Sequence, residues 1–440
     1  MNVVERYKQL LGKLSTMTFH GFEQYDMGRM MSDNIAIYKF YGIGRFAFIK
    51  MFSTFIFNYN RIPINKRNDR IIAYLSDVYV ERRDFQHVYS LLEGIDNRIQ
   101  IWSEEKKVSI NFYALFDMLN IPRWYRQLKR IGIENNCCFF LIKRIEVCNK
   151  LKRLAQNRKI EEGTLAFISQ YDAHDTDNIL AQYMKLHGIP TITLQHGQFH
   201  SSAYKNEKNF YFAVPHFGFV SDYFFAWGAY SKEQAMQDGI EGDRVETVGS
   251  LKMESIQHSG STDNKLNDKE SKMFSVILDG GVEGKEENAM LLQCAQRVYA
   301  EYGYKYCVRP HPGEDIKEID KARKMPGCCM ISEQEETICQ LADRSFFSIC
   351  GNSTVVTELI AYNKPVFFAK SKNAIDWYEG FEELRFTNYE ELQTWIEILV
   401  QHKNVILEHM ENYKRKLFAT MNVEQSYREG IRKAIAKGSR

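Results

Sequence analysis

A histidine directly follows a strongly β-forming run of the chain. The run Thr191–Leu194 leads into Gln195-His196-Gly197, and the glycine allows the backbone to approach a ligand closely. An imidazole in this position suits a general base, or a group that orients a phosphate. The competing interpretation is a structural histidine that hydrogen-bonds a backbone carbonyl.

A second histidine lies between two prolines and close to an arginine. In Arg309-Pro310-His311-Pro312 the prolines stiffen the backbone and hold the imidazole in one direction. A guanidinium and an imidazole presented together suit phosphate oxygens, so Arg309 and His311 are candidate phosphate ligands. The alternative is an ordinary turn that happens to contain a histidine.

A small polar turn, Gly351-Asn352-Ser353-Thr354, precedes a predicted helix. Its backbone N–H groups and hydroxyls could hold an anion such as a diphosphate, which makes Asn352, Ser353 and Thr354 candidate ligands. One turn further, Glu358 could reach a ribose diol. The competing interpretations are a helix cap at Asn352 or Ser353 and an exposed helix glutamate.

A glycine pair follows another apolar run, Val276–Leu278. Gly280 would let the backbone approach a diphosphate at this strand end. An ordinary tight turn explains the same residues equally well.

An acidic cluster follows the predicted strand Thr164–Ser169. Its residues should lie beside His196, because strands joined by a βαβ crossover are commonly neighbours. Asp172 and His174 therefore join His196 as candidates for a base that accepts a hydroxyl proton. Asp175-Thr176-Asp177 spells Asp-x-Asp, which can hold a metal, but Asp is also expected where a helix begins. We therefore predict no metal site and no cofactor.

The elements that must position these residues alternate as strand and helix. From Thr164 onward they form βαβ units, which imply parallel sheets. The almost wholly polar stretch 257–272 indicates a linker. The predicted organisation is an N-terminal domain 1–256, the linker 257–272, a C-terminal domain 273–400 and helices over 401–440 that pack back toward the N-terminal domain. Both domains should be Rossmann-like.

Composition excludes several classes. A net charge of +2 with scattered basic residues argues against nucleic acid as a partner. Nine cysteines without a Cys-x-x-Cys pair, and an N-terminus without the apolar core of a signal peptide, indicate reduced thiols in the cytoplasm. The chain contains no Walker A, dinucleotide-binding or Gly-x-Ser-x-Gly motif, so ATPase, dehydrogenase and hydrolase functions lose support.

The aromatic and basic segment Tyr38–Arg61 has a composition suited to a membrane interface. It predicts peripheral contact with an anionic membrane, at the inner face of the cell membrane. A core helix or strand pair is the alternative, and we favour it over membrane contact.

Five short motifs, in order, resemble GT-B transferases, particularly bacterial polysialyltransferases, capsule glycosyltransferases and CDP-glycerol glycerophosphotransferases. They are LQHGQF from Leu194, WG at Trp227, VGS at Val248, RPHP at Arg309, and GNSTVVTELIAYNKPVFF from Gly351. The resemblance implies two parallel sheets that face an interdomain cleft, and a metal-independent, inverting transfer.

The resemblance also implies roles for individual residues. His311 would contact the donor phosphate, Ser353 and Thr354 would hold the same group, and His196 matches the histidine-glycine motif of the glycerophosphotransferases. The chain has no counterpart of the Glu-Asp-Gly motif that supplies the base in polysialyltransferases. The base therefore stays open among His196, Asp172 and His174.

The expected function is a glycosyltransferase that moves a sugar from a nucleotide-activated donor to a growing surface polysaccharide or a lipid-linked oligosaccharide. The alternatives are a CDP-polyol phosphotransferase of wall-polymer synthesis and a non-hydrolysing nucleotide-sugar 2-epimerase. A catalytically silent binding subunit is a further alternative, against which the intact His196, Arg309 and His311 argue.

Overall fold

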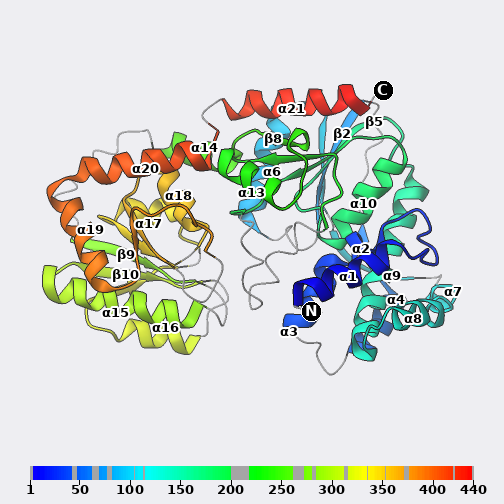
Figure 1. The fold of residues 1–440 in the computed structure, drawn as a ribbon, viewed down its shortest axis with the longest axis horizontal. Coiled ribbons are helices and arrows are strands. Elements are labelled where there is room, and N and C mark those ends of the chain that lie inside the picture. Colours follow the sequence, from blue (N-terminus) through cyan, green and yellow to red (C-terminus); the bar gives the residue numbers. More distant parts are fainter. Residues whose placement is uncertain are drawn as a thin grey trace.

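The molecule contains two six-stranded parallel sheets, one in the N-terminal domain and one in the C-terminal domain (Figure 1). The computed structural model describes residues 3–41, 47–61, 69–76, 82–103, 105–111, 114–199, 218–260, 272–279, 284–311, 316–333, 335–351, 353–370, 376–419 and 422–438.

The N-terminal sheet has the strand order β3-β2-β5-β6-β7-β8, and every neighbouring pair is parallel. Its strands are β2 (Arg70–Leu75), β3 (Ile99–Ser103), β5 (Thr164–Ser169), β6 (Thr191–Leu194), β7 (Tyr223–Ala226) and β8 (Val245–Thr247). The strands β2, β6 and β7 are buried along their whole length, as expected for a parallel sheet covered on both faces.

Helices cover this sheet and form a lobe at one end of it. They are α1 (Val3–Ser15), α2 (Met27–Met30), α3 (Ser32–Tyr41), α4 (Ala47–Ile56), α6 (Arg83–Ile95), α7 (Ala114–Met118), α8 (Ile121–Arg130), α9 (Asn135–Arg158), α10 (Asp175–Leu186), α13 (Ala229–Gln237), η3 (Gly242–Arg244) and α14 (Leu251–Gly260). A separate antiparallel pair, β1 (Phe57–Arg61) and β4 (Glu105–Ile110), lies in the lobe with α4, α7, α8 and α9.

The C-terminal sheet has the order β11-β10-β9-β12-β13-β14, again with parallel neighbours. Its strands are β9 (Met273–Ile277), β10 (Lys305–Arg309), β11 (Cys328–Ile331), β12 (Ser348–Cys350), β13 (Val366–Ala369) and β14 (Arg385–Phe386). Its helices are α15 (Gly284–Tyr302), α16 (Ile316–Arg323), α17 (Ile338–Asp343), α18 (Val355–Ala361), α19 (Tyr389–Gln401) and α20 (Lys403–Leu417).

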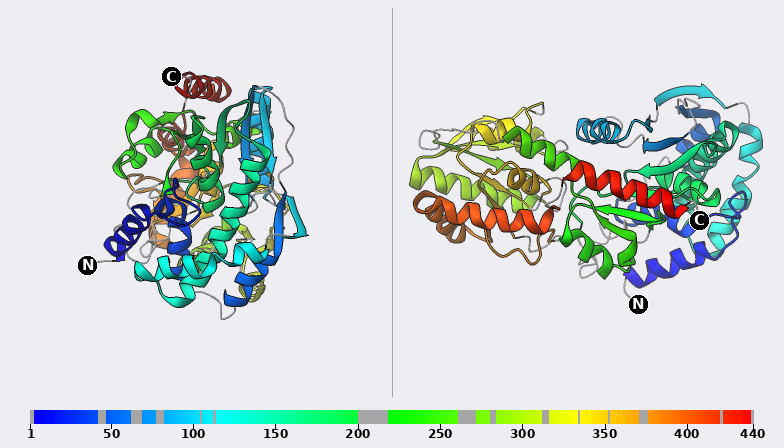
Figure 2. Two further views of the ribbon diagram at one scale, coloured as in Figure 1. Left: turned by 90° about the vertical axis from the view of Figure 1, so that its right-hand side faces the viewer. Right: turned by 90° about the horizontal axis from the view of Figure 1, so that it is seen from above.

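The last helix, α21 (Val423–Gly438), returns to the N-terminal sheet (Figures 1 and 2). Its buried face joins one apolar cluster with residues of β5, β6 and β7. The Tyr427 ring meets the Phe225 ring edge-to-face at a centroid distance of 5.5 Å. The chain therefore crosses from the C-terminal domain and ends on the N-terminal one.

The doubly wound α/β prediction is confirmed for both sheets. Two details differ from the expectation. Helix α14 continues to Gly260, inside the stretch predicted as linker, and the remainder, 261–271, lies outside the described residues. The first 160 residues, for which no individual strand is predicted, contribute the strands β2 and β3 to the same sheet.

Within the segment Tyr38–Arg61, the described side chains of α4 favour the core interpretation. Met51 and Phe55 are fully buried and pack in one cluster with Trp124 of α8. Among the described residues, no helix has the length and apolar character needed to cross a bilayer.

Candidate active site

The carboxyl edge of the N-terminal sheet brings His196 beside the acidic cluster. Strands β5 and β6 are direct neighbours, with Ser169 opposite Thr193. The exposed imidazole of His196 lies against the ring of Tyr171, at a centroid distance of 4.4 Å and a tilt of 55°. His196 therefore lies at the surface of this edge, on an aromatic support.

The carboxyl edge of the C-terminal sheet gathers the ends of β9, β10 and β12. Ile277 lies opposite both Arg309 and Cys350, so the three strands end at one level. A Cβ atom on Gly351 would lie 2.6 Å from Asp279 Oδ2 and 3.0 Å from Glu287 Oε1. Only glycine leaves room here for two carboxylates against the backbone.

The two edges approach each other through the motif turns. A Cβ atom on Gly197 would lie 3.7 Å from Thr354 Cγ2, which is van der Waals distance across the domains. Beside it, Gln198 Nε2 donates to the carbonyl oxygen of Trp377 at 3.5 Å, and Tyr230 Oη donates to the same oxygen at 3.3 Å. The turn after β6 thus faces the turn after β12.

Asp172 is buried beneath this edge and does not open onto it. Its Oδ2 accepts the backbone N–H groups of Val220 and Ser221 at 2.9 and 2.6 Å. Burial raises the pKa of this carboxyl, although the two N–H groups and the Ser221 side chain oppose the shift. Asp172 fastens the chain that leads into β7, which is a structural task.

His174 belongs to a buried network of charged side chains at the start of α10. Its Nδ1 lies 3.0 Å from Thr176 Oγ1 and 3.7 Å from Asp177 Oδ2. Burial lowers the pKa of His174, but the hydrogen bond with Asp177 and the charge of Asp175 outweigh it and raise the pKa to about 9. An imidazole that is already protonated at neutral pH cannot accept a proton.

The carboxylates of the Asp-x-Asp triplet have protein partners. Arg144 binds Asp175 with both Nε and Nη2, and Asn34 Nδ2 donates to Asp175 Oδ2 at 2.9 Å. Asp177 faces His174. Among the described residues, no group of three histidine, cysteine or acidic side chains could hold a metal ion.

Arg309 turns toward the neighbouring loop. Its Nη1 donates to Ser332 Oγ at 3.1 Å and to the carbonyl oxygen of Glu336 at 2.6 Å. Burial lowers the pKa of this guanidinium, while the charge of Glu336 opposes the shift. His311 is exposed two residues beyond β10, at the same sheet edge as the Ser353–Thr354 turn.

The turn before α18 is held from below. Tyr378 Oη donates to the Ser353 carbonyl oxygen at 2.7 Å, while Ser353 is half-buried and Thr354 exposed. Asn352 and Gly280, two further predicted ligands, lie outside the described residues.

Glu358 forms an ion pair with Lys252 of α14 at 2.9 Å, and Lys252 also approaches Asp84 of α6 at 4.0 Å. Glu358 is thereby committed to the junction of the domains.

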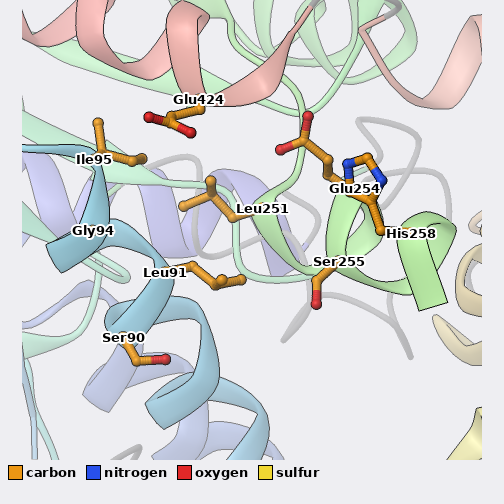
Figure 3. Close-up of a pocket in the computed structure, with 9 residues that line it drawn as sticks. All are labelled: Ser90, Leu91, Gly94, Ile95, Leu251, Glu254, Ser255, His258 and Glu424. Carbon is orange, nitrogen blue, oxygen red and sulfur yellow. The ribbon is translucent and has the colours of Figure 1, made fainter.

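A separate cavity of about 640 Å³ lies between α6, α14 and α21 (Figure 3). Leu91, Glu254 and Glu424 line it, and none of the predicted site residues does. It is distinct from the strand-end site.

The sequence matches no protein-family model and no curated protein. Solved structures are similar over most of the chain. UDP-GlcNAc 2-epimerase from Neisseria meningitidis bound to UDP-GlcNAc shares 13% identity, with a TM-score of 0.54 over 83% of this chain and 100% of that one. MnaA from S. aureus, solved with UDP, shares 13% identity, with a TM-score of 0.52 over 82% and 95%.

A third similar structure is a trehalose 6-phosphate synthase from Burkholderia multivorans, at 10% identity and a TM-score of 0.51 over 85% of this chain and 100% of that one. The chain has the GT-B fold. At these identities the similarity shows the fold alone, and the GT-B fold accounts for the facing strand ends seen here. Enzymes of more than one reaction class share it.

Several residues at the site were given no role from the sequence. Tyr171 contacts His196 between neighbouring strand ends, and Gln198 donates to the Trp377 carbonyl oxygen across the domains. Glu287 of α15 lies close to Gly351. Tyr171 adjoins Asp172 and Gln198 lies within the LQHGQF motif, so both could have been found from the sequence. Trp377 and Glu287 are brought in by tertiary contacts alone.

Proposed function

We propose that this GT-B chain is a metal-independent, inverting glycosyltransferase. Its donor would be a nucleotide-activated sugar, and its acceptor a growing surface polysaccharide or a lipid-linked oligosaccharide. The observation that carries the proposal is the approach of Gly197 to Thr354, which brings an exposed histidine and a hydroxyl-bearing turn to opposite sides of one junction.

His196 is the base in this proposal. Asp172 is buried against two backbone N–H groups, and His174 has a pKa of about 9, so neither is available to take a proton. His196 is the exposed member of the three, at the surface of the sheet edge. Its support by Tyr171 restricts the directions in which the imidazole can point.

The donor phosphates would lie on the opposite side, against Ser353, Thr354 and His311. Hydroxyls and an imidazole can stabilise the charge that develops on a departing phosphate. Two of the similar structures were solved with UDP or UDP-GlcNAc, which supports a nucleotide-sugar as the class of donor. Arg309 would act as a positioning residue, because its bonds hold the loop at Ser332 and Glu336.

The transfer balances as a single displacement. The acceptor oxygen forms a bond to the anomeric carbon as the bond from that carbon to the phosphate oxygen breaks. The acceptor proton passes to the imidazole of His196, and the nucleoside phosphate leaves with the electron pair and its negative charge. One attack from the face opposite the leaving group inverts the configuration.

The test is a His196→Ala variant with a matched control. His187 is also exposed and also lies against a tyrosine, Tyr183, at a centroid distance of 4.6 Å and a tilt of 51°, but it caps α10 away from the strand ends. We expect His196→Ala to lower turnover on the order of 100-fold or more and His187→Ala to leave it near wild type. Nucleotide release from an identified donor measures both, and equal rates for the two variants would contradict the proposal.

A nucleotide-sugar 2-epimerase is the second candidate, favoured by one observation. Epimerisation needs acid and base groups, and the carboxylates of Asp279 and Glu287 converge at Gly351 on the C-terminal edge. The two reactions are separated by their products. An epimerase changes the configuration of the sugar without an acceptor, whereas a transferase releases the nucleotide only when an acceptor is present. Nucleotide release together with transfer of a polyol phosphate to the acceptor, in place of a sugar, would indicate the CDP-polyol phosphotransferase.

A further inference from the structure

An exposed apolar tip ends the helical lobe of the N-terminal domain. Five large hydrophobic side chains form it, with exposed fractions from 41% to 78%: Ile56, Ile110, Leu115, Phe116 and Leu119. They account for five of the eleven exposed large hydrophobics among the described residues, and the other six are scattered over the chain. Such clustering of exposed hydrophobic side chains is typical of a surface that binds a partner or a membrane.

Hydrogen bonds made by Asn111 hold the elements of the tip together. Asn111 donates its backbone N–H to the Ile56 carbonyl at 2.8 Å and its side-chain N–H to Asp117 Oδ2 at 2.9 Å. Arg153 binds the same carboxylate, so the acidic side chain of α7 is buried and paired beneath the tip. The outward face of α7 is left to Leu115 and Phe116.

A cationic helix continues from the tip. Turn hydrogen bonds link α7 to α8 through Leu119 and Asn120, and α8 buries Trp124 and Leu128 against the lobe. Its outward positions are therefore basic: Arg123, Arg126, Lys129 and Arg130 are all exposed. Within the described residues, Arg126, Lys129 and Arg130 have no carboxylate at ion-pair distance.

We propose that this tip and helix α8 dock on an anionic lipid bilayer, with Leu115, Phe116 and Leu119 entering the headgroup region. Apolar side chains flanked by unpaired cations complement a negatively charged interface. In Figure 1 α7 and α8 lie on the side of the N-terminal domain away from the C-terminal domain, so docking leaves both strand edges uncovered. The inference places membrane contact at the described residues of this tip and of α8, and does not depend on the transferase chemistry.

A second copy of the chain fits the same surface less well. A twofold contact places the same patch on both subunits, so two cationic α8 helices would be brought together. Like charges at close range oppose that contact. An anionic bilayer is attracted by the same residues.

The test is flotation of the full chain with vesicles at low salt. We expect binding to phosphatidylcholine vesicles that contain phosphatidylglycerol, and little binding to phosphatidylcholine alone. The triple variant Leu115→Ser, Phe116→Ser, Leu119→Ser should lower the partition coefficient on the order of tenfold or more. Arg126→Glu with Arg130→Glu should lower it about tenfold at low salt, with the difference shrinking as salt is added.

Matched controls alter the same residue types elsewhere. Leu186→Ser, Met236→Ser and Val400→Ser remove exposed hydrophobics outside the lobe, and Arg323→Glu with Lys324→Glu reverses charge on and just after α16. Both controls should bind as wild type, with thermal unfolding used to confirm that every variant is folded. The proposal would be overturned if the wild type does not float with anionic vesicles, or if the controls lose as much binding as the tip and α8 variants. It would also be overturned if the wild type is a dimer that the tip variant converts to monomers.

Discussion

Three side chains that look equivalent in the sequence have different surroundings in the fold. Asp172, His174 and His196 all follow parallel strands, where ligands gather in open sheets. Asp172 has its carboxylate committed to backbone N–H groups, and His174 is surrounded by Asp177 and Asp175. The environment of each group, rather than its chemical type, decides which can exchange a proton with a substrate.

Asp172 provides a first test at this scale. Asp172→Ala leaves the N–H groups of Val220 and Ser221 buried without an acceptor, which should cost on the order of 3 kcal/mol of stability. Asp172→Asn keeps an acceptor oxygen and should retain most of both stability and turnover. Melting temperature and nucleotide release measure the two effects. Lost turnover in Asp172→Asn at an unchanged melting temperature would instead make Asp172 catalytic.

His174 predicts a pH dependence of stability. Its pKa rises from 6.5 to about 9 on folding, so its stabilising contribution is fully present below pH 6.5 and is lost as the pH rises through about 9. The contribution is on the order of 3 kcal/mol. The groups that face it are Asp33, Arg144, Asp175 and Asp177. Burial raises the pKa of Asp33 to about 6, so this carboxyl is still partly protonated at pH 6.5 and completes its titration below the pH at which His174 loses its proton.

The measurement compares melting temperatures at pH 6.5 and pH 9 for wild type and His174→Gln. The wild type should lose more stability than the variant between these two values. Parallel losses would mean that His174 does not carry the titration.

At the scale of elements, α21 holds the end of the chain on the N-terminal sheet. It does so through a close approach of helix backbone to Phe225, because a Cβ atom on Gly430 would lie 2.7 Å from Phe225 Cζ. The Phe225 ring is itself packed against Tyr427 in this cluster. A methyl group at position 430 must therefore displace a packed ring.

Gly430→Ala should destabilise the chain by about 1 to 2 kcal/mol, since overpacking exceeds the gain in helix propensity. Gly12→Ala in α1 is the matched control, because a Cβ atom there meets nothing within 4 Å. That variant should gain up to about 1 kcal/mol. Urea unfolding of both variants decides the matter, and a stabilised Gly430→Ala would show that α21 is not packed as described.

The strands from β5 to β13 could be predicted within one or two residues, because parallel strands are continuous apolar runs bounded by glycine and polar turns. The short last strand β14, which begins with Arg385, carries no such signal. Strand β2 could not be predicted either. It begins with Arg70, whose buried guanidinium donates to the carbonyl oxygens of Ile160 and Glu162 at 3.0 Å. A charged residue in a buried strand is acceptable only with those partners, and tertiary structure alone supplies them.

The candidate site, like the fold, could be predicted from the sequence only in part. Its motif residues could be predicted because strand ends and short polar turns are visible in the sequence. The burial of Asp172, the ion pair of Glu358 with Lys252 and the bonds of Arg309 to the Ser332 loop could not. Each depends on a partner between 23 and 106 positions away along the chain.

At the scale of the whole molecule, the two domains come together at turns that follow their strands and at the helices α13, α14, α18 and α20. A Cβ atom on Gly197 would lie at van der Waals distance from Thr354, and Gln198 and Tyr230 donate to the same carbonyl oxygen, that of Trp377. These contacts join one domain to the other at the motif turns, so a ligand held there touches both. Binding of such a ligand to the native state alone raises the melting temperature.

The central claim is that a nucleotide-sugar binds between these turns. The most direct measurement is the thermal shift produced by UDP-, CMP-, CDP-, GDP- and dTDP-linked compounds on wild type, Thr354→Trp and the matched exposed variant Thr394→Trp. One compound should raise the melting temperature of wild type and Thr394→Trp with increasing concentration, and leave Thr354→Trp unchanged. A wild type that responds to none of them, or a shift that persists undiminished in Thr354→Trp, would contradict the claim.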